Sequence, residues 1–264
     1  MSSRQVEKAA ARSRREAAQR EADARAHRAR RLWTLGGVAV GAALLVAAAI
    51  ALSGGGGGAK KLGSGARPPQ SSQVAALFAG IPQQGQALGR PDAPVTLVEF
   101  ADLKCPVCRD YSLQALPTLV QRYVRTGKLR IVMQPQTFVG APPGDSERAA
   151  RFALAAGAQG RLWQFSELWY DNQQDESTAY ATDAYIRQIA SGVAGLDVNA
   201  AMAARTSSSV TGALQQASSQ YDRQSFSGTP SFLLGRTGRP GSPLQVSSFD
   251  PSQFTGPIDR LLKG

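Results

Sequence analysis

The longest apolar stretch of the chain lies near its N-terminus. Leu32 to Leu52 is a run of 21 residues without a charged side chain. As a helix rising about 1.5 Å per residue it would be roughly 31 Å long, which matches the hydrocarbon core of a bilayer. Trp33 lies at its start, where an indole ring favours the headgroup layer. Because no polar face is left for solvent, the pattern predicts a single transmembrane helix over residues 32–52 rather than a buried core helix.

A cleaved signal peptide is the alternative for this segment, because Ala49-Ile50-Ala51 resembles a small-residue cleavage site. The apolar run is longer than the roughly 7–15 residues usual in signal peptides, and the basic region before it is long. We therefore favour an uncleaved signal anchor.

Residues 53–70 separate this segment from the rest of the chain. They include five consecutive glycines and two prolines, a composition that buries too little apolar surface to fold. We expect a flexible linker here, followed by a folded domain over residues 71–264.

The first part of this domain alternates between strand and helix patterns. A β-rich run covers residues 95–100, and a second apolar strand covers residues 129–133. Apolar residues between the two strands recur at helical spacing: Leu113, Leu116, Val120 and Tyr123. The pattern predicts a β-α-β unit with parallel strands and a right-handed crossover.

The second part begins with a block that lacks strand patterns, residues 145–225, in which several short helices are expected. Strands are predicted over residues 231–234 and 244–246, joined as a hairpin by a connection rich in Gly and Pro. Asp250-Pro251 is typical of a helix start, and apolar positions repeat at helical spacing after it. The order β-α-β, helical block, β-β-α indicates an α/β fold.

The net charge of +11, from 30 Lys and Arg against 19 Asp and Glu, is concentrated at the N-terminal end. Residues 1–31 carry +6, residues 32–67 carry +3 and residues 68–264 only +2. No aromatic side chain that could stack on bases precedes Trp33, so we expect no nucleic-acid partner. The positive-inside rule instead places the basic arm, residues 1–31, in the cytoplasm and the folded domain on the other side of the membrane.

The composition excludes several classes of enzyme. His27, in the basic arm, is the only histidine, which removes Ser-His-Asp and Cys-His enzymes. Two cysteines and one distant histidine cannot supply the ligands of a mixed Cys/His zinc site, and we expect no metal. No GxxxxGK[ST] phosphate-binding loop is present.

Both cysteines fall in one CxxC motif, Cys105-Pro106-Val107-Cys108, after a buried strand and at the start of a helix. At a helix N-terminus Cys105 faces unpaired N–H groups and the positive end of the helix dipole, which stabilise a thiolate and lower its pKa. Lys104 adds positive charge nearby. A lower pKa stabilises the dithiol form and makes the disulfide more oxidising.

A CxxC motif alone could also be half of a zinc site or an inert structural disulfide. A second half-site is absent from the sequence. The motif is also expected outside the cytoplasm, where disulfides persist. We therefore favour a redox-active Cys105–Cys108 disulfide.

The segment Val98-Glu99-Phe100-Ala101-Asp102-Leu103-Lys104-Cys105-Pro106-Val107-Cys108 is followed 120 residues later by Gly228-Thr229-Pro230-Ser231-Phe232. These paired motifs resemble those of the DsbA-like thiol:disulfide oxidoreductases of the thioredoxin superfamily, and more narrowly the membrane-anchored, actinobacterial-type bacterial forms. The resemblance covers about residues 75–264, and the helical block matches the helical insertion of that family. It implies a thioredoxin-like fold with a central mixed sheet and a helical insertion.

The resemblance also implies a role for each matching residue. Cys105 would be the exposed attacking cysteine and Cys108 the buried resolving one. Thr229 and Pro230 would form a loop with a cis-proline that faces the disulfide and pairs with the main chain of the substrate; an ordinary trans proline at the start of a strand is the alternative. Glu99, six residues before the first cysteine, would be a buried acid that moves a proton to or from Cys108, whereas its alternative is a solvent-exposed acid.

One position departs from the family's strongest oxidants, which have histidine before the second cysteine. Val107 occupies that position here. With Lys104 and Pro106 it belongs to the residues expected to tune the pKa of Cys105. We expect a less acidic Cys105 and a milder oxidant.

The expected function is dithiol–disulfide exchange on exported proteins that are unfolded or contain cysteines. The enzyme would be reoxidised by a membrane quinone-linked partner, and its own disulfide would be its only redox group. One alternative keeps the site but reverses its direction: a reductase or isomerase that serves envelope-protein or cytochrome maturation. The other alternative is a chaperone-like binding domain with an inert disulfide.

Overall fold

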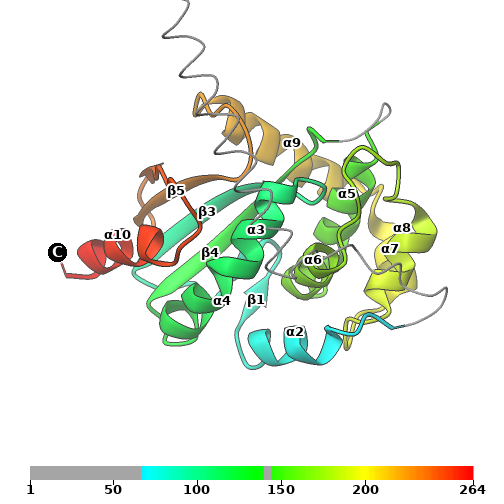
Figure 1. Ribbon diagram of the computed structural model, residues 1–264, viewed down its shortest axis with the longest axis horizontal. Helices are drawn as coiled ribbons and strands as arrows, with labels where there is room; N and C mark the ends of the chain where they lie inside the picture. Colours follow the sequence, from blue (N-terminus) through cyan, green and yellow to red (C-terminus); the bar gives the residue numbers. More distant parts are fainter. Residues whose placement is uncertain (1–66, 140–143, 264) are drawn as a thin grey trace, which may run out of the picture. The chain divides into compact units, whose positions relative to one another are not determined.

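The computed structural model describes residues 67–139 and 144–263 (Figure 1). The predicted basic arm, residues 1–31, and the predicted transmembrane helix, residues 32–52, lie outside the described residues, as does nearly all of the predicted linker. In the part of the chain that is described, no helix has the length and apolar character needed to cross a bilayer.

A mixed six-stranded sheet forms the centre of the described domain, with the strand order β1-β2-β4-β3-β5-β6. The strands are β1 (Gln83–Gln84), β2 (Ala87–Leu88), β3 (Val95–Asp102), β4 (Leu129–Gln136), β5 (Ser231–Arg236) and β6 (Ser242–Pro243). Strands β3 and β4 are parallel, and all the other pairs are antiparallel. The sheet thus has the mixed character that the resemblance implies.

The crossover between the parallel strands is helical, as the β-α-β prediction required. It runs through α3 (Pro106–Gln114), α4 (Leu116–Leu119) and the π-helix η1 (Val120–Val124). Pro117 lies in the first turn of α4, where its missing N–H costs no helical bond. The segment between β3 and β4 is therefore divided into consecutive helical pieces, and the first piece, α3, carries the second cysteine of the CxxC motif.

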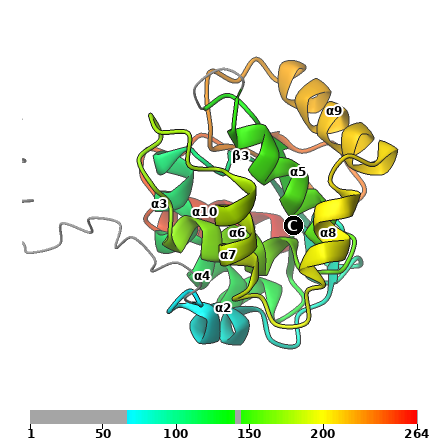
Figure 2. The same cartoon turned by 90° about the vertical axis from the view of Figure 1, so that its right-hand side faces the viewer.

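Among the described residues, five helices lie between β4 and β5: α5 (Ser146–Gly157), α6 (Leu162–Asp171), α7 (Asp183–Ala190), α8 (Val198–Ala204) and α9 (Ser208–Asp222). They agree with the predicted helical insertion over about residues 145–225 and are seen together in Figure 2. Thr182, Asp197 and Ser207 each accept a hydrogen bond from a first-turn N–H of α7, α8 and α9, respectively, which defines where these helices begin.

The two faces of the sheet carry different cores. On one face Leu97 of β3 belongs to the main core, which includes buried residues of α3, α6 and α10 (Ser252–Lys263). On the other face Phe100 of β3 packs edge-on against Tyr221 of α9, with ring centroids 5.7 Å apart. The period-two alternation of β3 thus places its side chains in both cores.

Three features of the fold differ from the sequence-based expectation. Helix α2 (Ser71–Phe78) and the strands β1 and β2 were not predicted, because the strands are only two residues long and show no alternation. The hairpin partner of β5 is residues 242–243, not residues 244–246. Pro243 has no N–H to donate, so this edge strand is short.

Candidate active site

Cys105 and Cys108 lie where the β3–α3 connection meets the start of α3. Cys105 is the N-cap residue of α3 and Pro106 follows in the first turn. Only 6% of Cys105 is exposed and Cys108 is fully buried, and both thiols are free in this structure. Cys105 is therefore the sulfur nearer the surface, and Cys108 is covered completely.

The two thiols have opposite proton affinities. The pKa of Cys105 is lowered to about 6, first because the Cys108 thiol donates a hydrogen bond to its sulfur, and further by Thr229 and by the N–H groups of Val107 and Cys108. Burial raises the pKa of Cys108 well above its usual value, and the neighbouring Cys105 adds to this shift. At neutral pH the reduced site therefore holds a thiolate on Cys105 and a proton on Cys108.

The loop before β5 closes the site from the other side. The peptide bond between Thr229 and Pro230 is cis, as the resemblance implies. The carbonyl oxygen of Thr229 lies 3.4 Å from Sγ of Cys105. Two segments that are more than 120 residues apart in the sequence thus meet at the sulfur atom.

Val107 presents an apolar side chain to solvent beside the disulfide-forming pair. Its side chain is 47% exposed, and Pro106 next to it is also exposed. Val107 acts on Cys105 through its main-chain N–H.

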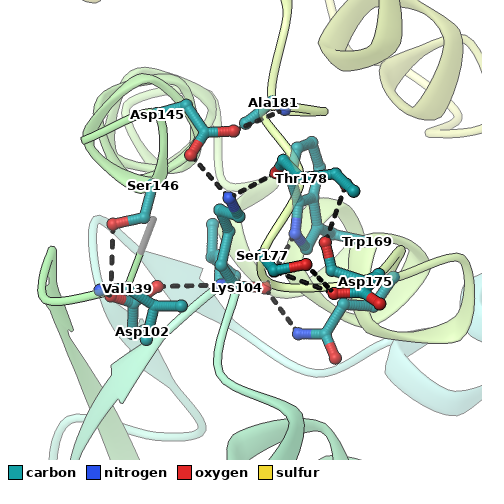
Figure 3. A network of polar contacts seen from close by, with 12 residues as sticks. Asp102, Lys104, Val139, Asp145, Ser146, Trp169, Asp175, Ser177, Thr178 and Ala181 are labelled. Atoms are coloured by element: carbon teal, nitrogen blue, oxygen red, sulfur yellow. Dashed lines mark hydrogen bonds and ion pairs between the residues drawn. The ribbon is translucent and has the colours of Figure 1, made fainter. Parts of the chain in front are cut away.

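Lys104 is fully buried, which the sequence did not indicate. Its ammonium group donates to Oδ1 of Asp145 at 2.6 Å and to the carbonyl oxygen of Thr178 at 2.8 Å (Figure 3). The ammonium group also lies 5.0 Å from the centre of the Tyr180 ring. Its charge is thus compensated by Asp145, and Lys104 is not among the main groups that lower the pKa of Cys105. The structure shows that Lys104 joins the β3–α3 connection to Asp145 and Thr178, and its expected tuning of Cys105 stays a prediction.

Asp102, the last residue of β3, holds the same connection from inside. Its Oδ1 accepts the N–H of Lys104 at 2.8 Å, and its Oδ2 accepts the N–H of Val139 at 2.9 Å and the hydroxyl of Ser146 at 3.1 Å (Figure 3). Burial raises its pKa, whereas these hydrogen bonds act in the opposite direction. Sequence reasoning gave no role to Asp102, because its partners come from distant segments.

Glu99 is buried in the core beneath this connection, with 1% of its surface exposed. Its pKa is raised to about 8, mainly by burial and further by the negative charge of Glu167. Its Oε2 atom has no hydrogen-bond partner in the protein. The solvent-exposed alternative for Glu99 is therefore wrong, and the side chain is an acid that holds its proton near neutral pH.

Glu167 of α6 was missed by the sequence reasoning. It is 4% exposed, and its Oε2 accepts a hydrogen bond of 2.5 Å from the hydroxyl of Ser112 in α3. A glutamate within an amphipathic helix is usually solvent-facing, so only its place between Phe165 and Leu168 in the sequence could have signalled burial.

Among the described residues no group of three or more His, Cys, Asp or Glu side chains could hold a metal ion.

Comparisons with known proteins agree with this geometry. A family model described as Thioredoxin matches residues 83–245. The "Probable disulfide bond formation protein D" of Bacillus cereus is 35% identical over 98 residues, which are 37% of this chain and 45% of that protein. The chain thus spans about half the length of the curated relatives it matches.

Two solved structures resemble the described domain. The oxidised BdbD of Bacillus subtilis superposes with a TM-score of 0.59 at 21% identity, over 68% of this chain and 94% of that one. A thioredoxin-like oxidoreductase from Silicibacter pomeroyi DSS-3 has a TM-score of 0.52 at 27% identity, over 72% of this chain and 98% of that one. The family model covers more than half of the chain. The sheet, the cis-proline loop and the CxxC helix also have the expected arrangement. The chain therefore belongs to the thioredoxin family.

Proposed function

We propose that this protein is a membrane-anchored thiol:disulfide oxidoreductase that exchanges disulfides with exported proteins through Cys105 and Cys108. The observation that carries the proposal is the pair of thiols with opposite pKa shifts at the N-terminus of α3, with the Thr229 carbonyl beside the outer sulfur. The names of the curated relatives, disulfide bond formation proteins, support the same class of reaction.

The reaction begins with the oxidised site. A substrate thiolate attacks Sγ of Cys105, the bond between Cys105 and Cys108 breaks, and Cys108 leaves and takes up a proton. A second substrate thiolate then attacks the substrate sulfur of the mixed disulfide, and Cys105 leaves as a thiolate. The substrate is oxidised by two electrons and the site becomes a dithiol. Because Cys108 is buried, incoming thiolates reach only Cys105.

The pKa of Cys105 sets how oxidising the site is. A thiolate that is stable in the folded protein is a good leaving group and favours the reduced form of the enzyme. Its value of about 6 lies between the roughly 7 of thioredoxin and the roughly 3.5 of the strongest oxidants in the superfamily. This intermediate pKa supports the expectation, based on Val107, that the protein is a milder oxidant than the strongest members of the superfamily.

Catalytic turnover requires that the dithiol be reoxidised. We propose that a membrane quinone-linked partner reoxidises it. A flexible tether over residues 53–70 would keep the domain close to this partner and so raise its local concentration.

Thr229 and Pro230 would pair with the main chain of an extended substrate, and Glu99 would exchange a proton with Cys108. The disulfide itself is the only redox group that this reaction needs.

Trapping of mixed disulfides in cells tests the proposal. A Cys108→Ser variant cannot form its own disulfide, but its Cys105 thiolate can attack the disulfide of an oxidised exported protein, which is the reverse of the last step. Without Cys108 the enzyme cannot release this mixed disulfide, so the variant should accumulate exported proteins linked through Cys105. The matched control, Cys105→Ser with Cys108→Ser, should trap none. Wild-type protein found mostly reduced, with no trapped partners, would contradict oxidation and favour the reductase or isomerase. A cellular function that survives Cys105→Ser would favour the non-redox binding domain.

A further inference from the structure

The interface between α3 and α6 contains a second buried carboxyl group that the reaction scheme does not use. Glu167 of α6 accepts a 2.5 Å hydrogen bond from the hydroxyl of Ser112. Ser112 lies four residues after Cys108 in α3, which is one helical turn along the same face. Glu167 is therefore connected by one hydrogen bond to the helix that carries the resolving cysteine.

Glu99, Glu167 and Tyr111 of α3 form one buried compartment. The ring of Tyr111 packs on Phe232, the residue opposite Glu99 across β3 and β5, with ring centroids 4.8 Å apart, and Ser112 beside it binds Glu167. The charges of both glutamates act on Tyr111 and raise its pKa, and the charge of Glu167 raises the pKa of Glu99. Two polar atoms of this compartment, Oε2 of Glu99 and the hydroxyl of Tyr111, have no hydrogen-bond partner in the protein. The charges of Cys108 and Glu99 both raise the pKa of the buried Tyr170.

No cation compensates these two acids. Among the described residues, neither Glu99 nor Glu167 forms an ion pair with a base. The titratable groups that face them are Tyr111 of α3 and Tyr170 of α6, and Asp171 acts on Glu167 from the half-exposed end of α6. Two buried carboxylates without a counter-charge cannot both ionise at low cost, so the proton affinity of each depends on the state of the other.

We propose that Glu99 and Glu167 form a coupled acid pair in which Glu167 sets the pH at which Glu99 exchanges a proton with Cys108. Glu167 is thus a positioning residue that acts through Glu99, and its hydrogen bond with Ser112 fixes it to the helix of the CxxC motif. The inference deepens the proposed function and rests on it. When Cys108 attacks a mixed disulfide, its thiol proton passes to the Glu99 carboxylate, and the thiol bound to Cys105 leaves as a thiolate.

The test isolates this step in the full-length chain purified in detergent. Cys105 is first converted to a mixed disulfide with glutathione, and the attack of Cys108 is followed as release of glutathione between pH 5 and 10. The wild-type rate should rise with an inflection near pH 8, where Glu99 loses its proton. Glu167→Gln removes the negative charge, so the inflection should move down by roughly half a pH unit or more.

Two further variants identify the origin of the inflection. Glu99→Gln should abolish it, because the titrating base is gone. Glu147→Gln is the matched control: this carboxyl is half-exposed on α5 and pairs with Arg151, so its loss should leave the profile unchanged. An unmoved inflection in folded Glu167→Gln would overturn the acid pair alone. A wild-type chain that releases no glutathione at any pH would overturn the proposed function as well.

A measurement on the wild-type chain covers the case in which Glu167→Gln does not fold. Carbon-13 NMR of labelled glutamate carboxyls should show two buried groups that titrate near pH 8, each with a second step where it senses its partner. The coupled pair is wrong if every glutamate carboxyl titrates in a single step below pH 6.

Discussion

At the scale of single residues, the chemistry of the site is determined by what surrounds each sulfur. The thiol of Cys108 and the N–H groups at the start of α3 stabilise the Cys105 thiolate, whereas burial keeps the proton on Cys108. Neutral donors thus lower the pKa of Cys105, and burial raises that of Cys108, while the lysine beside the motif is engaged by Asp145. A charged group at position 107 is the simplest addition that would change this balance.

Replacing Val107 by histidine should lower the pKa of Cys105 further below about 6 and make the disulfide more oxidising, because a protonated imidazole next to the sulfur stabilises the thiolate. Ultraviolet absorbance of the thiolate, recorded against pH in the reduced chain, measures the change. Val107→Ala is the control, since it keeps the N–H that acts on Cys105. An unchanged titration in Val107→His would show that the exposed side chain at position 107 is too distant to act.

The buried acids give a stability effect of known sign. A carboxyl whose pKa is raised in the folded state is protonated there while it is already ionised in the unfolded chain, so stability is lost as the pH rises from about 4.3 to about 8. Urea unfolding of the disulfide form should show a decline on the order of a few kcal/mol across this window, reduced in Glu99→Gln. Equal pH dependence in wild type and variant would contradict the burial of an ionisable Glu99.

At the scale of elements, the polar network around Lys104 joins parts of the fold that are far apart in the sequence. The β3–α3 connection supplies Asp102 and Lys104, and the helical insertion supplies Asp145 and Thr178 (Figure 3). The Lys104–Asp145 pair has almost no exposed surface, with 0% and 3% of the two side chains accessible. An ion pair this deeply buried is sensitive to the loss of either partner.

Asp145→Asn should lower the free energy of unfolding by roughly 3–5 kcal/mol, because it leaves the Lys104 ammonium buried without a counter-charge. Lys104→Met combined with Asp145→Leu should restore much of this loss, since no charge then remains buried. Glu147→Gln breaks a partly exposed ion pair nearby and should cost no more than about 1 kcal/mol. Chemical denaturation of the four proteins measures all three differences, and equal effects of Asp145→Asn and Glu147→Gln would disprove the anchoring role.

The elements themselves were predictable to the extent that their signals are local. The β-rich run at 95–100 and the cysteines at 105 and 108 identified the β-α-β unit and the redox motif, and the resemblance added Glu99 and Pro230. The positions of Lys104, Asp145 and Glu167 were not predictable, because their burial results from packing of the helical insertion against α3. A charged residue in the sequence carries no indication of a partner that lies 41 or 55 positions away.

At the scale of the whole molecule, the position of the chain relative to the membrane decides whether the disulfide has substrates. The charge distribution predicts that residues 1–31 remain in the cytoplasm and that the described domain lies outside it. In intact cells a membrane-impermeant thiol reagent should therefore label Cys105 of the Cys108→Ser variant after mild reduction. Labelling that requires permeabilised cells would place the domain on the cytoplasmic side and contradict the proposed substrates.

The ion pair between Lys104 and Asp145 also limits how this domain can be re-engineered. The helical insertion of a thioredoxin-family protein is an obvious segment to exchange when new substrate specificity is wanted. Here such a chimera would carry a lysine next to the reactive cysteine but bring a foreign residue to the position of its aspartate. The two residues must therefore be exchanged together, even though they belong to segments that a designer would treat as separate modules.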